Sequence, residues 1–342
     1  MLQPLSLVDE HADVLLNLPR SPVAPFLSLP NYAEDMAIRE AILGKATQWS
    51  LQEQTAQPYY RTSNDFSISL DAATALPSFS KSLARAVSQP EGTLMTARIL
   101  LGLWASRHHD PHLSFNGRVM IHHDEILSWR GVQKHHRRAY AGSQKHFSDG
   151  YPWKQRQQVQ QDLVLLSRYH LRGQHIIRSG SNVQSVVIDA PYLVLTPIEK
   201  QGKVVGYLIA PGSWISSYEA HQMNFLACVP YQLFHLNPRN DYLAVRLTFY
   251  LIEHWRRHGH EGSAHTSFCM ASLLSSSMIA IDKANLTSRF VPRVEAALQK
   301  LYSIHFLEEP PRILSIVDRT KAYWGKDWLA SSWQLVPAQD NQ

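Results

Sequence analysis

The densest group of potential metal ligands in this sequence lies around residue 260. It contains four histidines, one glutamate and one cysteine: His254, His258, His260, Glu261, His265 and Cys269. His254 and His258 stand four residues apart, so on a helix both imidazoles could bind one metal ion. The group lacks the paired ligand spacing of a zinc finger, and solvated histidines at the end of a basic helix explain it more simply. We therefore expect neither a metal site nor a cofactor.

Motifs for catalysis are also absent from the sequence. Gly44 and Lys45 lack the upstream glycine and the following serine or threonine of a P-loop, and no Gly-x-Ser-x-Gly elbow occurs. A rolling-circle nickase needs two histidines that flank one apolar residue, with a tyrosine nucleophile nearby. His122 and His123 are adjacent instead, and together with Asp124 they are better explained as a strand end and a helix cap. We expect a protein without enzymatic activity.

Positive charge is concentrated in one stretch of the chain. Residues 118–178 hold 11 basic and 4 acidic side chains, a net charge of +7, whereas the whole chain carries +5. Seven of the 18 histidines lie in the same stretch, so mild acidification would raise its charge further. Such a band is typical of proteins that bind a phosphate backbone. The alternative is a solvated basic face without a partner.

A helix predicted from Pro152 to about Tyr169 would carry much of this band. Val159, Leu163, Leu166 and His170 share one of its faces, which predicts a buried stripe. The opposite face carries Lys154, Gln157, Gln161 and Arg168. Basic side chains suit phosphates and guanine, and glutamine suits adenine, so this face could read DNA. A glutamine-rich surface helix is the alternative.

The elements around this helix follow the order of a winged helix-turn-helix. Before it, the sequence predicts a buried helix from Leu94, a strand over residues 118–121, and a short helix that Asp124 caps and Gly131 ends. After it, residues 171–178 and 183–188 predict a hairpin, with a further strand pair over 192–195 and 204–209. In such a module the third helix enters the major groove and the hairpin contacts the flanking backbone.

The same order recurs later in the chain. Residues 97–104 resemble residues 245–252, an offset of 148, and Leu163, Leu166 and His170 align with Leu298, Leu301 and His305 at an offset of 135. The two aligned helices begin with Arg156 and Arg293. A helix-compatible run over 266–281 lies between the repeated segments, and strands over 312–317 and 328–336 would enclose a long second wing.

Length and composition agree with several globular domains. The 342 residues exceed what one core usually needs, and the chain is 44% hydrophobic and 18% charged. We predict an α+β, mainly α protein with two tandem winged helix-turn-helix domains: an N-terminal arm or small appended module (1–89), a basic first domain (90–212), a linker (213–239) and a second domain (240–337). Without a membrane-spanning run, and with only Cys228 and Cys269 as cysteines, a cytoplasmic protein is expected.

The segment Asp124-Glu125-Ile126-Leu127, followed by Arg130-Gly131 and an arginine-led helix that ends in Leu-x-x-Leu, resembles the plasmid replication initiator (Rep) family. The resemblance covers roughly residues 90–337. It implies binding to repeated origin sequences through the third helix of each module, dimerisation through the first module, and melting of nearby DNA with host replication proteins. The basic excess in the first module and the N-terminal arm depart from the family pattern.

The predicted function is sequence-specific binding of double-stranded DNA, as the replication initiator of a plasmid-like element. The expected phosphate contacts are Lys134, Arg137, Arg138, Lys145, Lys154 and Arg172. Gln157, Gln161 and Arg168 would approach base edges, and His175 and Arg178 would belong to the wing. The alternatives are a transcriptional regulator of the same fold and a non-catalytic module that docks a helicase or polymerase.

Overall fold

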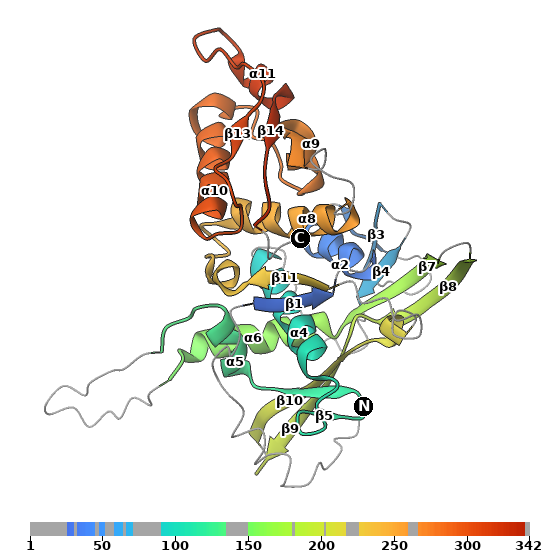
Figure 1. The fold of residues 1–342 in the computed structure, drawn as a ribbon. Coiled ribbons are helices and arrows are strands. Elements are labelled where there is room, and N and C mark those ends of the chain that lie inside the picture. Colours follow the sequence, from blue (N-terminus) through green and yellow to red (C-terminus); the bar gives the residue numbers. More distant parts are fainter. Residues whose placement is uncertain are drawn as a thin grey trace, which may run out of the picture.

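The structure is a computed structural model that mixes helices and sheets (Figure 1). It describes residues 26–30, 33–44, 48–51, 58–63, 66–70, 90–134, 150–179, 182–201, 203–216, 226–258 and 266–338. In this part of the chain, none of the helices has the length and apolar character needed to cross a membrane.

The first unit, from Pro90 to Pro211, is built on helices that pack against a four-stranded sheet. Strand β6 pairs antiparallel with β10, with Ile121 opposite Tyr207 and Val119 opposite Ile209, and the strand order is β5-β6-β10-β9. The elements are α4 (Pro90–Arg107), β5 (Ser114–Phe115), β6 (Arg118–Ile121), α5 (His123–Trp129), α6 (Trp153–Leu166), β9 (Leu193–Lys200) and β10 (Lys203–Pro211). The predicted helices, the strand at 118–121 and the later strand pair are therefore confirmed.

The hairpin predicted as the first wing belongs to a different sheet. It is formed by β7 (Tyr169–Ser179) and β8 (Asn182–Pro191), and β7 pairs with β4 (Ser67–Leu70). This sheet has the order β2-β3-β4-β7-β8, with β2 at Ser50–Leu51 and β3 at Pro58–Arg61. Leu171 and Ile68 are paired and fully buried, so the hairpin covers its apolar side chains with N-terminal strands. The strands that pair with β6 are β5 and β10, and β9 pairs with the other edge of β10.

Segments before residue 90 and after residue 213 also pack on the first unit. Strand β1 (Phe26–Pro30) pairs antiparallel with β11 (Leu226–Pro230), and β1 lies against α4. A Cβ atom on Gly102 would stand 2.4 Å from the Leu27 side chain, so only glycine allows this approach. The same N-terminal segment contains helix α2 (Ala33–Leu43). The predicted boundaries at 89 and 213 thus lie between segments that pair or pack together.

The second unit, from Tyr242 to Gln334, has a three-stranded sheet of order β12-β14-β13. The run predicted as helix over 266–281 begins with a strand, because Phe268 is buried opposite Trp333. The strand predicted over 328–336 is shortened by a helix, since the buried Trp328 packs from α11 and donates its indole N–H to Glu295. The elements are α8 (Tyr242–His258), β12 (Ser267–Cys269), α9 (Met270–Ser276), α10 (Val291–Ser303), β13 (Arg312–Ile313), α11 (Trp324–Ala330) and β14 (Ser332–Gln334).

Both units share one strand order. The order β6-β10-β9 of the first unit matches the order β12-β14-β13 of the second, and the first unit has β5 as an additional edge strand. The pairing joins β6 to β10 in the first unit and β12 to β14 in the second. This shared order supports the internal repeat that the sequence indicated.

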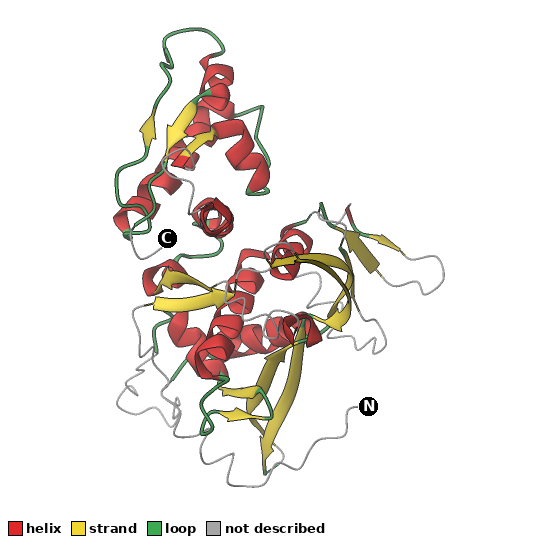
Figure 2. Ribbon diagram, turned by 45° about the vertical axis from the view of Figure 1, so that its right-hand side comes forward, coloured by secondary structure: helices red, strands yellow, loops and turns green. Residues whose placement is uncertain are grey.

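A buried network of charges joins the two units. Glu253 of α8 accepts hydrogen bonds or ion pairs from Arg98 of α4 and Arg39 of α2, each with a nitrogen to oxygen distance of 3.0 Å. Arg98 also forms an ion pair with Asp35, whose carboxylate accepts a hydrogen bond of 2.9 Å from the Tyr192 hydroxyl. All five side chains are buried. Figure 2 shows the two units, with a helix seen end-on where they meet.

Candidate nucleic-acid interface

Helix α6 is positioned by its apolar face. Val159, Leu163 and Leu166 are fully buried, as the sequence predicts, and they belong to a continuous core that also includes Leu251 of α8. The helix ends at Leu166, three residues earlier than expected, because Tyr169 already pairs with Leu70 as part of β7. His170 therefore lies on a strand and is not part of the helical stripe.

A bidentate ion pair holds the start of α6 against α5. The Arg156 guanidinium donates from Nε to Asp124 Oδ1 at 2.6 Å and from Nη2 to Oδ2 at 2.7 Å. Burial alone would raise the pKa of Asp124, but the hydrogen bonds from Arg156 and the charges of His122 and His123 lower it overall. Arg156, near the start of α6, thus fixes the angle between α5 and α6.

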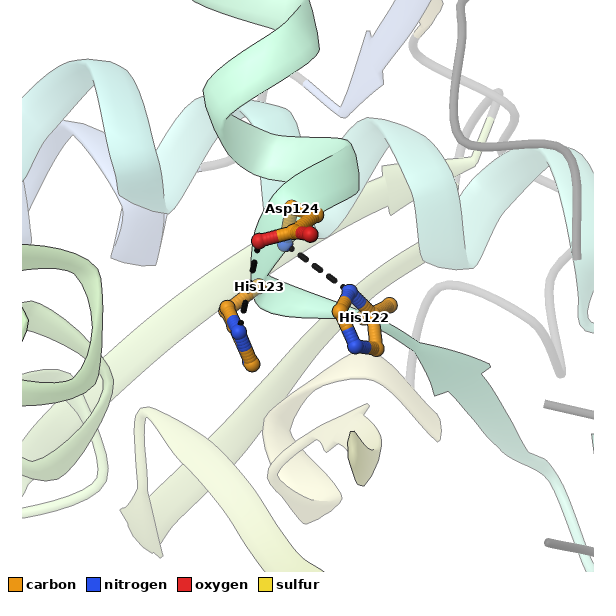
Figure 3. A group of neighbouring side chains, drawn as sticks. All are labelled: His122, His123 and Asp124. Atoms are coloured by element: carbon orange, nitrogen blue, oxygen red, sulfur yellow. Dashed lines mark hydrogen bonds and ion pairs between the residues drawn. The ribbon is translucent and has the colours of Figure 1, made fainter. Parts of the chain in front are cut away.

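Figure 3 shows that His122, His123 and Asp124 lie together where β6 meets α5. Their ligand atoms lie within 4.8 Å of one another, a spacing that could hold a metal ion. The His122 Nδ1 atom accepts a hydrogen bond of 3.0 Å from the Asp124 backbone N–H, so His122 is the helix cap and the sequence expectation of Asp124 as the cap is wrong. Both carboxylate oxygens of Asp124 are bound by Arg156. The contacts agree with the interpretation of this cluster as a helix start.

The group around residue 260 lies partly outside the described residues, which do not include His260, Glu261 and His265. His254 packs its ring 4.8 Å from that of Phe268. Cys269 is an exposed, free thiol.

The variant Arg156→Met should lower the free energy of unfolding at pH 7 by about 1–3 kcal/mol, because it leaves the buried Asp124 carboxylate without its charged partner. The value lies below that of a fully buried pair since the guanidinium is partly exposed. A lowered carboxyl pKa contributes stability above the unfolded-state pKa near 4, and this contribution is lost as the pH falls through the lower folded-state value. Urea unfolding of both proteins at pH 7 and at pH 3 measures this, and the difference should shrink at pH 3.

The matched control is Arg172→Met, whose partner Asp189 is exposed, and it should change the free energy of unfolding by about 0–1 kcal/mol. Equal losses for the two variants would contradict a special role of the Arg156 pair.

Some of the predicted DNA contacts gather at the N-terminal end of α6. Lys154 is exposed, Gln157 is half-buried, and Lys134 is exposed with its ammonium 5.5 Å from the centre of the Tyr151 ring. Trp153, which was not among the predicted DNA contacts, exposes 70% of its surface at the same end. The structure thus brings two cations, an amide and an aromatic ring together.

The other predicted contacts are spread over different elements. Arg168 and Arg172 lie past the C-terminal end of α6. Because α6 is about 20 Å long, they are far from Lys154 at its N-terminal end. Arg172 is exposed and pairs with Asp189 across the hairpin at 3.1 Å, and Gln161 is half-buried. His175 and Arg178 lie on β7, but their side chains are not described. Arg137, Arg138 and Lys145 lie outside the described residues, so their predicted phosphate contacts stay predictions.

Helix α10 of the second unit occupies the same place in the order as α6, and none of its residues was predicted as a contact. Its buried face contains Leu298 and Leu301, as the aligned repeat predicts. Its exposed face and the turn before it present Arg289, Arg293, Gln299 and Lys300. The alignment of Arg293 with Arg156 was the signal that could have identified this face.

Comparison with known proteins gives limited matches. No protein-family model and no curated protein matches the chain. Among solved structures, a selenomethionine derivative of domains 2 and 3 of RctB is 12% identical, with a TM-score of 0.40, and covers 87% of this chain and 97% of that chain. A second structure of RctB domains 2-3 is 11% identical, with a TM-score of 0.39, and covers 85% and 91%. These values are too low to assign a function to this protein.

Proposed function

We propose that the chain is a sequence-specific double-stranded DNA-binding protein without enzymatic activity, built from two tandem winged helices. The observation that carries this proposal is the strand order shared by both units, with the third helix of each turning cations and amides outward. Such a helix suits the major groove, and the edge hairpin suits the flanking backbone. In the first unit that hairpin is β9 and β10, so we move the wing from residues 171–188 to residues 193–211.

The biological role that we propose is replication initiation of a plasmid-like element in the cytoplasm. Two DNA-binding units in one chain suit a site made of repeated or paired sequences. The resemblance of residues 124–131 and the following helix to the plasmid replication initiator family supports this role. Dimerisation and contacts with host replication proteins belong to the same proposal.

The test is a competition titration of the whole chain across a salt series. Duplexes from the neighbourhood of the gene compete with random duplex for the protein. We expect a preference of several hundredfold, about 10³, for repeated sequence, together with a steep loss of affinity with salt. Weak binding without preference would contradict the proposal and favour docking of another protein.

Single variants at the N-terminal end of α6 separate two kinds of contact. Lys154→Ala should weaken binding to every duplex alike and flatten the salt dependence, because it removes one phosphate contact. Gln157→Ala should relax the preference at one base pair by about 1–3 kcal/mol, because it removes a base contact. Titrations against single-base-pair substitutions of the site measure both. A uniform loss for Gln157→Ala would contradict its role in reading bases.

A further inference from the structure

The loop between β13 and α11, residues 314–323, exposes three apolar side chains along its length. Ile316 is 100% exposed, Leu314 is 55% exposed and Tyr323 is 82% exposed. A single exposed apolar side chain is ordinary, but three within ten residues are unusual for a loop with no apolar partner. The loop and α11 connect the antiparallel strands β13 and β14, the place in the order that a wing would take.

Hydrogen bonds hold this loop in shape. At its start, the Leu314 N–H donates to the Ser332 carbonyl at 2.8 Å, and the Ser332 N–H donates to the Ser315 hydroxyl at 3.1 Å. Beyond Ile316, Asp318 Oδ1 accepts hydrogen bonds from the Thr320 N–H at 3.0 Å and from its hydroxyl at 2.6 Å. Hydrogen bonds therefore hold the loop both before and after Ile316.

A second anchor fastens the loop to α10. Arg319 forms an ion pair with Glu295 of α10, and its guanidinium lies 5.2 Å from the centre of the Trp324 ring. Glu295 also accepts the indole hydrogen bond of Trp328 at 2.9 Å. The loop is therefore fixed relative to the helix that we propose as the DNA-reading helix of the second unit.

Positive charge surrounds the apolar side chains of the loop. Residues 312–326 contain four basic side chains and one acidic side chain. Arg312 and Lys321 are both exposed, and each has an exposed carboxylate beside it, Glu309 at 3.3 Å from Arg312 and Asp318 at 3.9 Å from Lys321. A partner for this surface must offer anions around an apolar slot. A second copy of the loop would bring like charges together, whereas DNA presents phosphates on both sides of its stacked bases.

We propose that this loop is a DNA wedge, in which Ile316 inserts from the minor groove between two base pairs while Arg312 and Lys321 contact the flanking phosphates. Apolar side chains that enter a base step in this way unstack it and kink the duplex. The inference rests on the proposed DNA-binding function and adds a distortion of the site to it. A preformed loop favours insertion because little conformational entropy is lost on binding.

The test uses the whole chain and its selected duplex, with 2-aminopurine placed at one position after another. Binding of the wild-type protein should raise 2-aminopurine fluorescence at one base step, because unstacking relieves quenching. Ile316→Ser should abolish this rise and reduce the bend measured by fluorescence transfer between the duplex ends. Its Kd should change by less than about tenfold, since the variant loses the contact and the cost of unstacking together.

The matched control is Val187→Ser, which changes a 76% exposed apolar side chain on β8, and it should leave fluorescence and bend unchanged. Site-specific binding by the wild type with no rise at any position would overturn the wedge and leave the proposed function standing. Loss of all site preference in the wild type would overturn both. If Ile316→Ser instead dissociates a dimer seen by sedimentation and leaves the fluorescence unchanged, the loop is a contact between copies and the wedge is wrong.

Discussion

Glu253→Ala should lower the free energy of unfolding by about 3–5 kcal/mol, because it leaves the buried guanidinium of Arg39 without a carboxylate and that of Arg98 with Asp35 alone. Arg39 and Arg98 each place a nitrogen 3.0 Å from a Glu253 oxygen, and all three side chains are almost fully buried. Removing the carboxylate leaves two buried cations with one carboxylate between them, in a region that water does not reach. Urea unfolding followed by tryptophan fluorescence measures the loss.

The control for this variant is Asp189→Ala, which removes a carboxylate from the exposed pair with Arg172 and His170. It should change the free energy of unfolding by about 0–1 kcal/mol, because water screens the exposed charges and solvates the cations that remain. If Glu253→Ala costs no more than Asp189→Ala, the buried network does not stabilise the contact between α2, α4 and α8.

A second large effect is expected from the spacing of the DNA site. Once the footprint is mapped, insertion of five base pairs between the two halves should lower the affinity by about 10²–10⁴, down to that of one unit alone. The inserted half turn places the second half on the opposite face of the duplex. The two units cannot follow it, because α4 and α8 are joined directly by Arg98 and Glu253 inside a continuous core.

An insertion of ten base pairs separates a rigid protein from a flexible one. It restores the face of the duplex but moves the second half about 34 Å further along the axis. A rigid junction cannot span this distance, so the affinity should stay at the level of the five-base-pair insertion. Recovery of the affinity with ten base pairs would show that the units move independently, and the same titration with each half alone provides the reference values.

The sequence by itself determined most of the helices and their core stripes, and it indicated the repeat. Val159, Leu163 and Leu166 recur at helical spacing, and burial of such a stripe is favoured whatever lies opposite it. Gly131, at a φ of +63°, ends α5 as expected, because glycine adopts this conformation without strain. The repeated order of elements could be predicted for the same reason, since each element depends on residues close to one another in the chain.

Strand partners were decided by the tertiary structure. The pattern of residues 171–178 predicts a strand, but nothing local distinguishes β6 from β4 as its neighbour. Leu171 meets Ile68 because both become fully buried, and this contact joins residues 103 positions apart. Trp328 likewise suits a strand by its type, yet its indole hydrogen bond to Glu295 and its burial place it on a helix.

The arrangement of the charges also came only from the fold. Arg98, Arg39 and Glu253 lie far apart in the chain, and only packing of α2, α4 and α8 buries them together. The fold also separates basic residues of the stretch 118–178 into partly buried and exposed ones. Arg156 turns inward to Asp124, whereas Lys154 stays exposed two residues earlier, because one helix presents its successive side chains to different surroundings.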